Sequence, residues 1–208
     1  MRQAVARVIL AAAAAVALSG GARAEAARFA DEARRDPSLM AARRDFIAAL
    51  EQRNEAALRR LLDPKIGVGN GGEGPDDLIK LLRERPAFAD EFVAILRLGG
   101  RFSGPNLFLV PYTAKPSYSE KDEERLFARK PGVVLRAAPR DDAPVARALG
   151  HAVVKAKFDD ALQKQGWVEI VGPAGYAGFV RDADVFFVGQ AFIHFGKVRG
   201  RWLVVRAY

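Results

Sequence analysis

The chain has 208 residues, with 33 Lys or Arg and 25 Asp or Glu, so its formal net charge is +8 at pH 7. It contains no cysteine, which excludes disulfides, thiol catalysis and cysteine-ligated metal sites. Scattered arginines without a groove-entering motif argue against a nucleic-acid partner. The positive charge is compatible with long-range attraction to an acidic envelope polymer or to anionic lipid head groups.

Residues 1–24 have the composition of a secretory signal peptide. Arg2 and Arg7 form a positive n-region, Val8 to Leu18 make an apolar core, and Ala22-Arg23-Ala24 is a small-x-small cleavage site. The core is short for a bilayer span, which needs about 20 apolar residues. We therefore expect cleavage near Ala24 and a periplasmic or secreted mature chain that has no membrane span.

Residues 25–115 are expected to form a helical α+β region. Apolar side chains recur there at intervals of three and four residues, which is typical of amphipathic helices. The spacing predicts helices at about 39–53, 55–62, 76–84 and 88–98, and short strands at 65–70, 101–102 and 106–112.

A Gly-rich loop at residues 71–75 precedes the third of these helices. It lacks the Gly-Lys-Ser/Thr of a phosphate-binding loop, so we expect no nucleotide and no other cofactor. Asp76 and Asp77, which follow Pro75, are better suited to the positive end of the helix dipole.

Residues 115–124 are polar, contain Pro116 and are the best linker candidate. From Val133 to Val185, short apolar runs alternate with Pro, Gly and Asp clusters at the spacing of a small β-barrel. This part of the sequence therefore predicts a second unit, built from strands, over residues 125–186.

The order of motifs in this second unit resembles the bacterial SH3-like (SH3b) domains of secreted and cell-envelope proteins. The matching segments are 134–139 for a Leu-x-x-Arg-x-x-Pro type of strand, 149–151 for a Leu-x-x-Gly-like turn, 166–170 for Gly-Trp-Val-x-Val and 175–180 for Gly-x-x-Gly-Tyr/Trp-Val. The resemblance implies a small inserted β-barrel. It also implies a groove, lined by aromatic rings and loop carboxylates, that holds peptidoglycan stem peptides or protein segments.

The groove positions that the resemblance assigns in this chain are Arg136, Asp141, Asp142, Trp167, Tyr176 and Phe179. We expect Phe179 to pack inside the barrel, which leaves Trp167, Tyr176 and the Asp141-Asp142 loop exposed to a ligand. Each position also has a structural interpretation. Trp167 is suited to anchoring the core or its rim, and Asp-Asp-Ala-Pro favours a type I turn.

The C-terminal residues 187–208 read as a hairpin with its turn near Val198 to Gly200. An isolated hairpin is marginal in water, so we expect it to pair with the strands near 65–70 and 101–112. Its Lys-x-x-Gly-x-Trp ending resembles the last hairpin of small α+β cones of the nuclear transport factor-like kind. The expected fold is thus a helical N-terminal half with a short antiparallel sheet completed by the C-terminal hairpin.

The overall order of elements also resembles a group of uncharacterised alphaproteobacterial periplasmic proteins that carry an SH3-like domain. This resemblance implies secretion and architecture and assigns no functional residue.

The sequence offers little catalytic chemistry. It has two histidines, His151 and His194, lacks a Gly-x-Ser-x-Gly nucleophile motif, and shows no zinc-ligand spacing. Two groups of carboxylates were considered for glycosidase chemistry, namely Glu73 with Asp76 or Asp77, and Asp159 with Asp160. Both lie among polar loop residues, so we expect neither an enzyme nor a metal site.

The sequence therefore predicts a secreted, non-catalytic binding protein of the cell envelope whose SH3-like domain binds peptidoglycan or a peptide. In the alternative interpretation, the chain is a structural or partner-binding periplasmic protein in which the barrel is only a scaffold. In a third interpretation, the chain is a carboxylate-based hydrolase.

Overall fold

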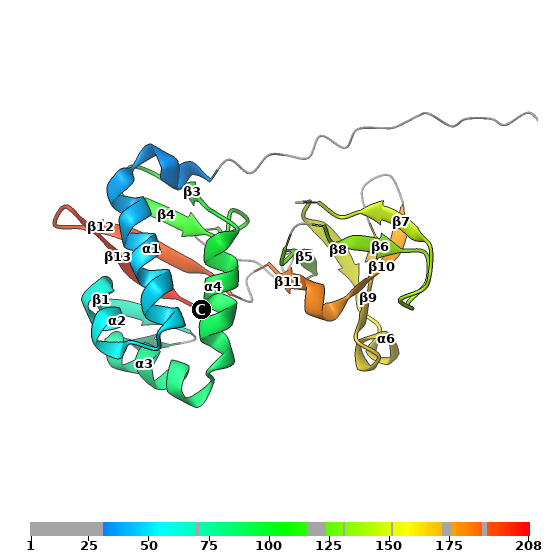
Figure 1. The fold of residues 1–208 in the computed structure, drawn as a ribbon, viewed down its shortest axis with the longest axis horizontal. Helices are drawn as coiled ribbons and strands as arrows, with labels where there is room; N and C mark the ends of the chain where they lie inside the picture. The colour runs from blue at the N-terminus through cyan, green and yellow to red at the C-terminus, as the bar shows by residue number, and fades with distance from the viewer. Residues whose placement is uncertain are drawn as a thin grey trace, which may run out of the picture.

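The computed structural model describes residues 31–69, 71–115, 124–130, 132–150, 152–171, 176–188 and 191–208. The predicted signal peptide, most of the predicted linker, His151 and Gly175 lie outside these ranges. The chain is a mixed α+β protein with two sheets, which belong to two lobes lying side by side (Figure 1). We call residues 31–115 with 191–208 the helical lobe, and residues 124–188 the β lobe.

The helical lobe contains four α-helices in its described part, close to the predicted ranges. They are α1 (Pro37–Glu51), α2 (Glu55–Leu61), α3 (Pro75–Glu84) and α4 (Ala87–Arg97), preceded by the 3-10 helix η1 (Glu32–Arg35). Asp36 and Asn54 accept backbone hydrogen bonds at the first turns of α1 and α2, as side chains at the N-cap position do. No helix in the described ranges is long and apolar enough to cross a bilayer.

The sheet of the helical lobe has six strands in the order β2-β1-β13-β12-β4-β3. Their bounds are β1 (Leu62–Val68), β2 (Gly72–Glu73), β3 (Arg101–Phe102), β4 (Leu107–Val110), β12 (Ile193–Val198) and β13 (Arg201–Ala207). The C-terminal hairpin β12–β13 therefore occupies the middle of the sheet, where β12 pairs with β4 and β13 pairs with β1.

The predicted antiparallel pairing holds for four of the five strand pairs of this sheet and is wrong for the fifth, because β1 and β13 run parallel. The reason lies in the connection between β1 and β4. Strands that run in the same direction need a crossover rather than a hairpin, and a helix usually supplies it. Here α3 and α4 carry the chain over one face of the sheet, so that β1 and β4 both run in the direction of β13.

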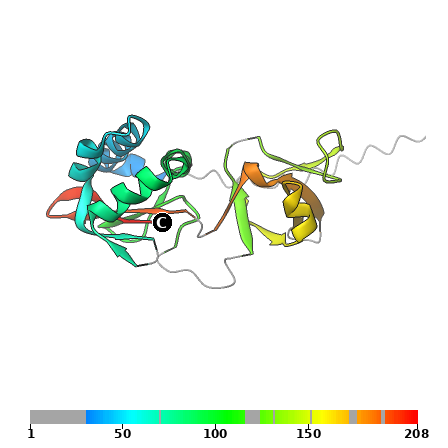
Figure 2. The same ribbon diagram turned by 90° about the horizontal axis from the view of Figure 1, so that it is seen from below.

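The helices lie on one face of this sheet, as Figure 2 shows. Side chains alternate along β12, so Ile193 and Phe195 point into the core beneath the helices. The ring of Phe195 meets that of Phe46 from α1 edge to face, with ring centroids 6.1 Å apart. The hairpin thus completes the sheet and also fills part of the helical core.

One carboxylate joins the start of α1 to the hairpin. Asp36 accepts hydrogen bonds from the backbone N–H groups of Ser38 (2.9 Å) and Leu39 (3.1 Å). It also accepts one from the indole Nε1–H of Trp202 (2.9 Å), and the Lys197 ammonium lies 3.5 Å away. The hydrogen bond from the Ser38 hydroxyl is the largest of several contributions that hold the pKa of Asp36 well below its usual range.

The β lobe consists of an antiparallel seven-stranded sheet in the order β11-β5-β8-β9-β10-β6-β7. The strands are β5 (Arg125–Ala128), β6 (Val134–Arg136), β7 (Val145–Ala148), β8 (Val154–Lys157), β9 (Trp167–Val171), β10 (Ala177–Arg181) and β11 (Val185–Phe187), with a short helix α6 (Asp160–Lys164) and the 3-10 helix η3 (Asp182–Asp184). In sequence they all fall between β4 and β12 of the other sheet. The seven strands do not close into the expected barrel, and β11 and β7 form the two ends of the sheet.

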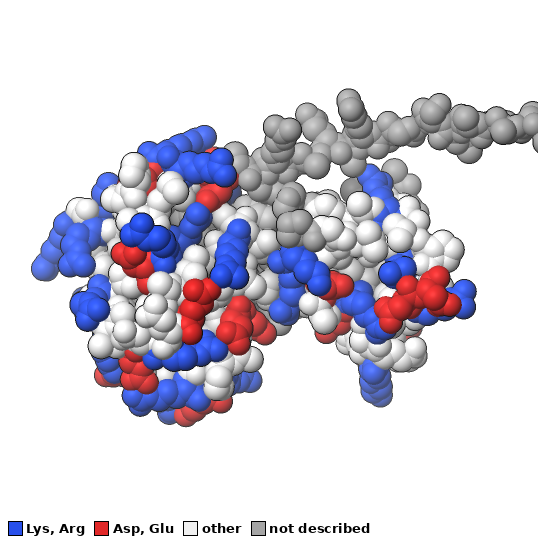
Figure 3. Space-filling view, in the orientation of Figure 1, with Lys and Arg blue, Asp and Glu red and all other residues white. Residues whose placement is uncertain are grey.

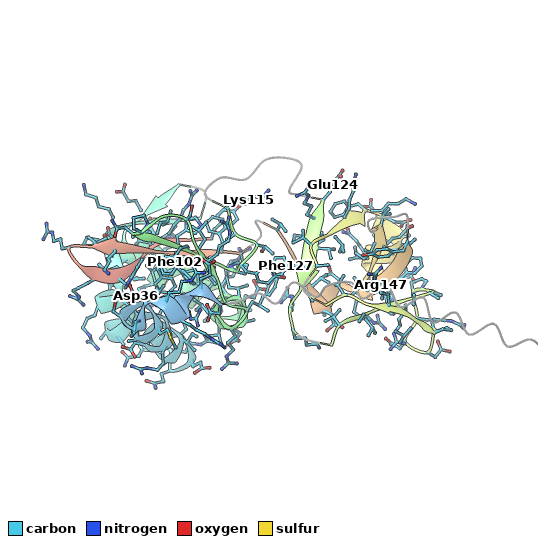
Figure 4. All side chains as sticks on the ribbon, turned by 90° about the horizontal axis from the view of Figure 1, so that it is seen from above. Asp36, Phe102, Lys115, Glu124, Phe127 and Arg147 are labelled. Atoms are coloured by element: carbon cyan, nitrogen blue, oxygen red, sulfur yellow. The ribbon has the colours of Figure 1, made fainter. Side chains whose placement is uncertain are left out.

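The β11 end of this sheet packs against the helical lobe. Phe127 of β5 and Phe186 of β11 belong to the apolar core of the helical lobe. Phe127 contacts both Tyr112 and Phe186, with ring centroids 5.9 and 5.8 Å apart. The Arg129 guanidinium lies over the Phe186 ring at 3.8 Å, and Figure 4 shows Phe127 at the junction of the lobes.

We expect Asp36→Ala to lower the free energy of unfolding by about 2 kcal/mol, because it removes an N-cap and leaves a buried indole N–H without its acceptor. Asp36 has a lower pKa in the folded chain than in the unfolded one, so its contribution is complete above the unfolded value of about 3.9 and is lost as the pH falls below it. Urea unfolding at several pH values measures both effects. The fall in the free energy of unfolding at low pH should be smaller in Asp36→Ala than in the wild type. Asp45→Ala, on the exposed face of α1, should show the same fall as the wild type.

Gly100 provides a second test of the packing. A Cβ atom at Gly100 would collide with the carbonyl oxygen of Leu109 and with the Phe108 ring. We expect Gly100→Ala to lower the thermal midpoint strongly, since the clash involves backbone and a buried ring. Gly67→Ala is the matched control, because its Cβ would make only an ordinary contact of 3.8 Å with Arg206. Similar midpoints for the two variants would contradict the packing described for β3 and β4.

Candidate functional site

The outer face of strands β6, β9 and β10 carries two of the predicted site residues, Arg136 and Trp167. Alternation along these strands sends Leu135, Val168, Ile170 and Val180 into the apolar cluster of the β lobe. The side chains between them point to the opposite face. The outward set is Arg136, Trp167, Glu169, Phe179 and Arg181.

Arg181 is the centre of this face, and the sequence analysis did not identify it. Its guanidinium makes a two-pronged ion pair with the Asp141 carboxylate, in which Nε lies 3.1 Å from Oδ1. It also donates to the carbonyl oxygen of Gln165 at 3.3 Å and lies over the Trp167 ring at 4.1 Å. Arg181 thus ties the β6–β7 loop and the end of α6 to strand β9.

Trp167 is buried beneath this arginine, with only 3% of its surface exposed. The expectation that its ring would be open to a ligand was therefore wrong. The ring lies outside the apolar cluster of the β lobe, on the outer side of the sheet, where Arg181 covers it. A planar guanidinium stacks well on an indole face, so Trp167 anchors Arg181 instead of offering a free platform.

Asp141 and Arg136 belong to the same cluster. The hydrogen bonds and the charge of Arg181, with a contribution from the charge of Arg136, hold the pKa of Asp141 below its usual value. Arg136 donates a hydrogen bond of 2.8 Å to the carbonyl oxygen of Ala143, and so holds the far side of the same loop. The carboxylate of Asp141 is therefore charged and is fixed in position from two sides.

Asp142 points away from this cluster. Its carboxylate is 78% exposed and lies 3.5 Å from Nε of Arg140. The backbone N–H of Ala143 donates to the carbonyl of Arg140, which closes a turn that begins one residue before the predicted Asp-Asp-Ala-Pro turn. Asp142 therefore has a turn position and an exposed charge, and its ion pair is with Arg140 in the same turn.

Phe179 lies on the outer face, where the sequence analysis expected it inside. In the strand register, Phe179 lies opposite Arg136 of β6 on one side and opposite Glu169 of β9 on the other. Glu169 in turn pairs with Lys157 at 3.2 Å. The half-buried Phe179 ring is therefore flanked by charged side chains of both signs. Its motif predicted a strand correctly but gave the wrong face, because the inward positions belong to Gly178 and Val180.

Tyr176 lies apart from this group. It packs against the apolar cluster of the β lobe and is half-buried. Arg147 of β7 lies over its ring at 4.6 Å, and Figure 4 marks Arg147 on the β lobe far from the junction. Within the described residues, no ion pair, hydrogen bond or ring contact joins Tyr176 to Trp167 or Asp141. The five predicted residues thus do not line one groove.

Three of the five carboxylates that could suit hydrolysis, those of Asp76, Asp77 and Asp159, have local structural roles. Asp77 accepts a hydrogen bond of 2.8 Å from the Glu73 backbone N–H, and Asp76 pairs with Arg59. Asp159 accepts from the first turn of α6, at 2.8 and 3.1 Å. All of these carboxylates are exposed, and burial is what raises a carboxyl pKa towards that of an acid catalyst.

His194 is buried on the sheet face opposite the helices, as its position between Ile193 and Phe195 predicts. Its ring stacks on that of Phe192 at 4.9 Å. Burial, with a smaller contribution from the charge of Arg206, lowers the pKa of His194 to about 4. Nε2 has no hydrogen-bond partner among the described residues. The imidazole is therefore neutral at physiological pH and packs as an aromatic ring.

In the part of the chain that the structure describes, no group of three or more His, Asp or Glu side chains is placed to hold a metal ion. No protein-family model matches the sequence, and a search of curated proteins returns no significant match. The site must therefore be interpreted from its own geometry.

The arrangement of Arg181 over Trp167 can be tested by fluorescence. We expect Arg181→Ala to expose the indole of Trp167, which should shift its emission to longer wavelength and increase quenching by acrylamide. Trp202, the second tryptophan, should not change, because its environment lies in the helical lobe. Arg147→Ala, which uncovers Tyr176 instead, is the matched control and should leave the tryptophan emission unaltered.

Proposed function

We propose that the chain is a non-catalytic binding protein of the cell envelope, exported to the periplasm or secreted after cleavage near Ala24. Its β lobe, which resembles an SH3-like domain in its motifs, binds the peptide part of peptidoglycan or another extended peptide. The observation that carries the proposal is the outer face of β6, β9 and β10, where the Phe179 ring lies between Arg136 and Glu169, with Arg181 and Asp141 on the same face.

The chemistry of this face suits a short peptide with charges of both signs. Peptidoglycan stem peptides combine small apolar side chains with free amino and carboxylate groups. The Phe179 ring offers an apolar contact, Glu169 can meet an amino group, and Arg136 can meet a carboxylate. The fixed Arg181–Asp141 pair limits how far the neighbouring loop can move, which reduces the entropy lost on binding.

The test uses insoluble peptidoglycan sacculi, which are incubated with the purified protein and pelleted. We expect the wild-type protein to be retained at both low and moderate salt, and Phe179→Ala to lose most of this retention. Phe158→Ala is the matched control, because Phe158 is a half-exposed ring of the same lobe that stacks on Phe187, away from the Phe179 face. Trp167→Ala is unsuitable, since Trp167 is buried.

Retention that disappears with salt for every variant would show only adhesion of a basic protein, because exposed charges are screened beyond about 8 Å at physiological ionic strength. Retention that does not depend on Phe179, or no retention, would contradict the proposed site. Either result would favour the alternative in which the β lobe is a scaffold and the protein binds a periplasmic partner through another surface.

A further inference from the structure

A separate pocket lies between the helices of the helical lobe. It has a volume of about 220 Å³ and is formed where the end of α1, the start of α2, the end of α3 and the start of α4 meet. Its walls are mainly aliphatic. The lining residues are Leu50, Arg53, Glu55, Leu58, Ile79, Leu82, Arg83, Pro86 and Ala89.

The pocket's charged residues carry an excess of positive charge. Two guanidinium groups, those of Arg53 and Arg83, line it together with one carboxylate, that of Glu55. Arg83 donates two hydrogen bonds to Glu55, and Arg53 donates one of 2.9 Å to Asp90 outside the pocket. Figure 3 shows side chains of both signs interleaved with uncharged surface over the helices. With Glu55 engaged by Arg83, Arg53 is the remaining guanidinium of the pocket. It also donates to the carbonyl oxygen of Leu50 at 3.3 Å, and its carboxylate partner Asp90 is not part of the lining.

Arg53 also has an unusual backbone conformation. Its φ angle is +52°, in the left-handed region that disfavours residues with a side chain. It follows the C-cap of α1, where its N–H donates to the carbonyl of Leu50 and the N–H of Asn54 donates to that of Ala49. This is a Schellman motif, and glycine is the usual residue at that position. An arginine at this position has a strained backbone, and glycine would relieve the strain. Strained residues of this kind cluster at ligand sites.

We propose that this pocket binds a small amphiphilic carboxylate, such as a medium-chain fatty acid. The hydrocarbon part lies against Leu82 and Pro86 at the mouth of the pocket, above its buried floor, and the carboxylate is held by Arg53. This site lies in the helical lobe and does not depend on the function proposed for the β lobe.

Asp90, the present partner of Arg53, does not prevent Arg53 from binding the carboxylate of a ligand. The Arg53–Asp90 pair is exposed to solvent, with 45% and 76% of the two side chains accessible, and such surface pairs contribute little to stability. A carboxylate whose tail is buried in the pocket is held close to Arg53 by the apolar contact. The ligand therefore replaces a weak, hydrated partner with one that is fixed in place.

The volume sets the size of the ligand. An apolar cavity of about 150 Å³ holds one benzene ring, so a pocket of about 220 Å³ accepts a somewhat larger apolar group. An eight-carbon chain folded within the pocket is a suitable probe, whereas a long-chain fatty acid would extend into solvent.

Octanoate is the probe for isothermal titration calorimetry with the purified protein. We expect saturable binding of octanoate, at least tenfold weaker binding of octanol, which lacks the charge, and no binding of octylammonium. Arg53→Gly should weaken octanoate binding at least tenfold while leaving the thermal midpoint unchanged or higher, because glycine relieves the backbone strain. That combination separates loss of a ligand contact from loss of structure.

Arg44→Ala is the control, since Arg44 is an exposed arginine of α1 that pairs with its neighbour Asp45; it should bind octanoate as the wild type does. Equal octanoate affinity in wild type and Arg53→Gly would overturn the proposal, and so would the absence of octanoate binding at millimolar concentration or preferential binding of octylammonium. None of these results bears on retention by peptidoglycan.

Discussion

The helical lobe depends on the insertion of the C-terminal hairpin into the middle of its sheet. β12 and β13 separate β1 from β4, so that neither early strand pairs with the other. Phe195 contributes to the helical core, and Trp202 and Lys197 hold the carboxylate at the start of α1. The same two strands thus supply backbone pairing, apolar contact and a helix cap. A lobe whose contacts converge in this way gains stability cooperatively, because disrupting the hairpin affects the sheet and the helices together.

In the β lobe, a guanidinium group joins several elements on the outer face, as the hairpin does in the helical lobe. Arg181 holds a loop, a helix end and a tryptophan ring. By covering Trp167 it leaves the neighbouring Phe179 as the accessible ring of this face. The two proposed sites also differ in their chemistry. The outer face of the β lobe combines charges of both signs around an aromatic ring, whereas the pocket of the helical lobe is aliphatic with one guanidinium in excess.

Local patterns in the sequence predicted the elements well and their three-dimensional relations less well. The helices begin near Asp36, Asn54 and Pro75 because capping is a local property, and the C-terminal hairpin follows from its two apolar runs and the turn at Arg199-Gly200. The parallel pairing of β1 with β13 depends on the α3–α4 crossover, and no local pattern encodes it. The burial of Trp167 arises from an arginine fourteen residues away on the adjacent strand. The alternation of Gly178 and Val180 could have placed both Phe179 and Arg181 on the outer face.

The order of strands along the chain has a consequence for the way in which this protein folds. During synthesis, domains generally fold from the N-terminus onwards, but here the helices made first cannot complete their sheet until the last residues are available. Trp202 donates a hydrogen bond to Asp36, so closing this contact brings together nearly the two ends of the described chain. The β lobe, whose strands are contiguous in sequence, can form before that closure. Such non-local pairing slows folding, so the helical part stays unfolded for longer, which suits the export that we propose.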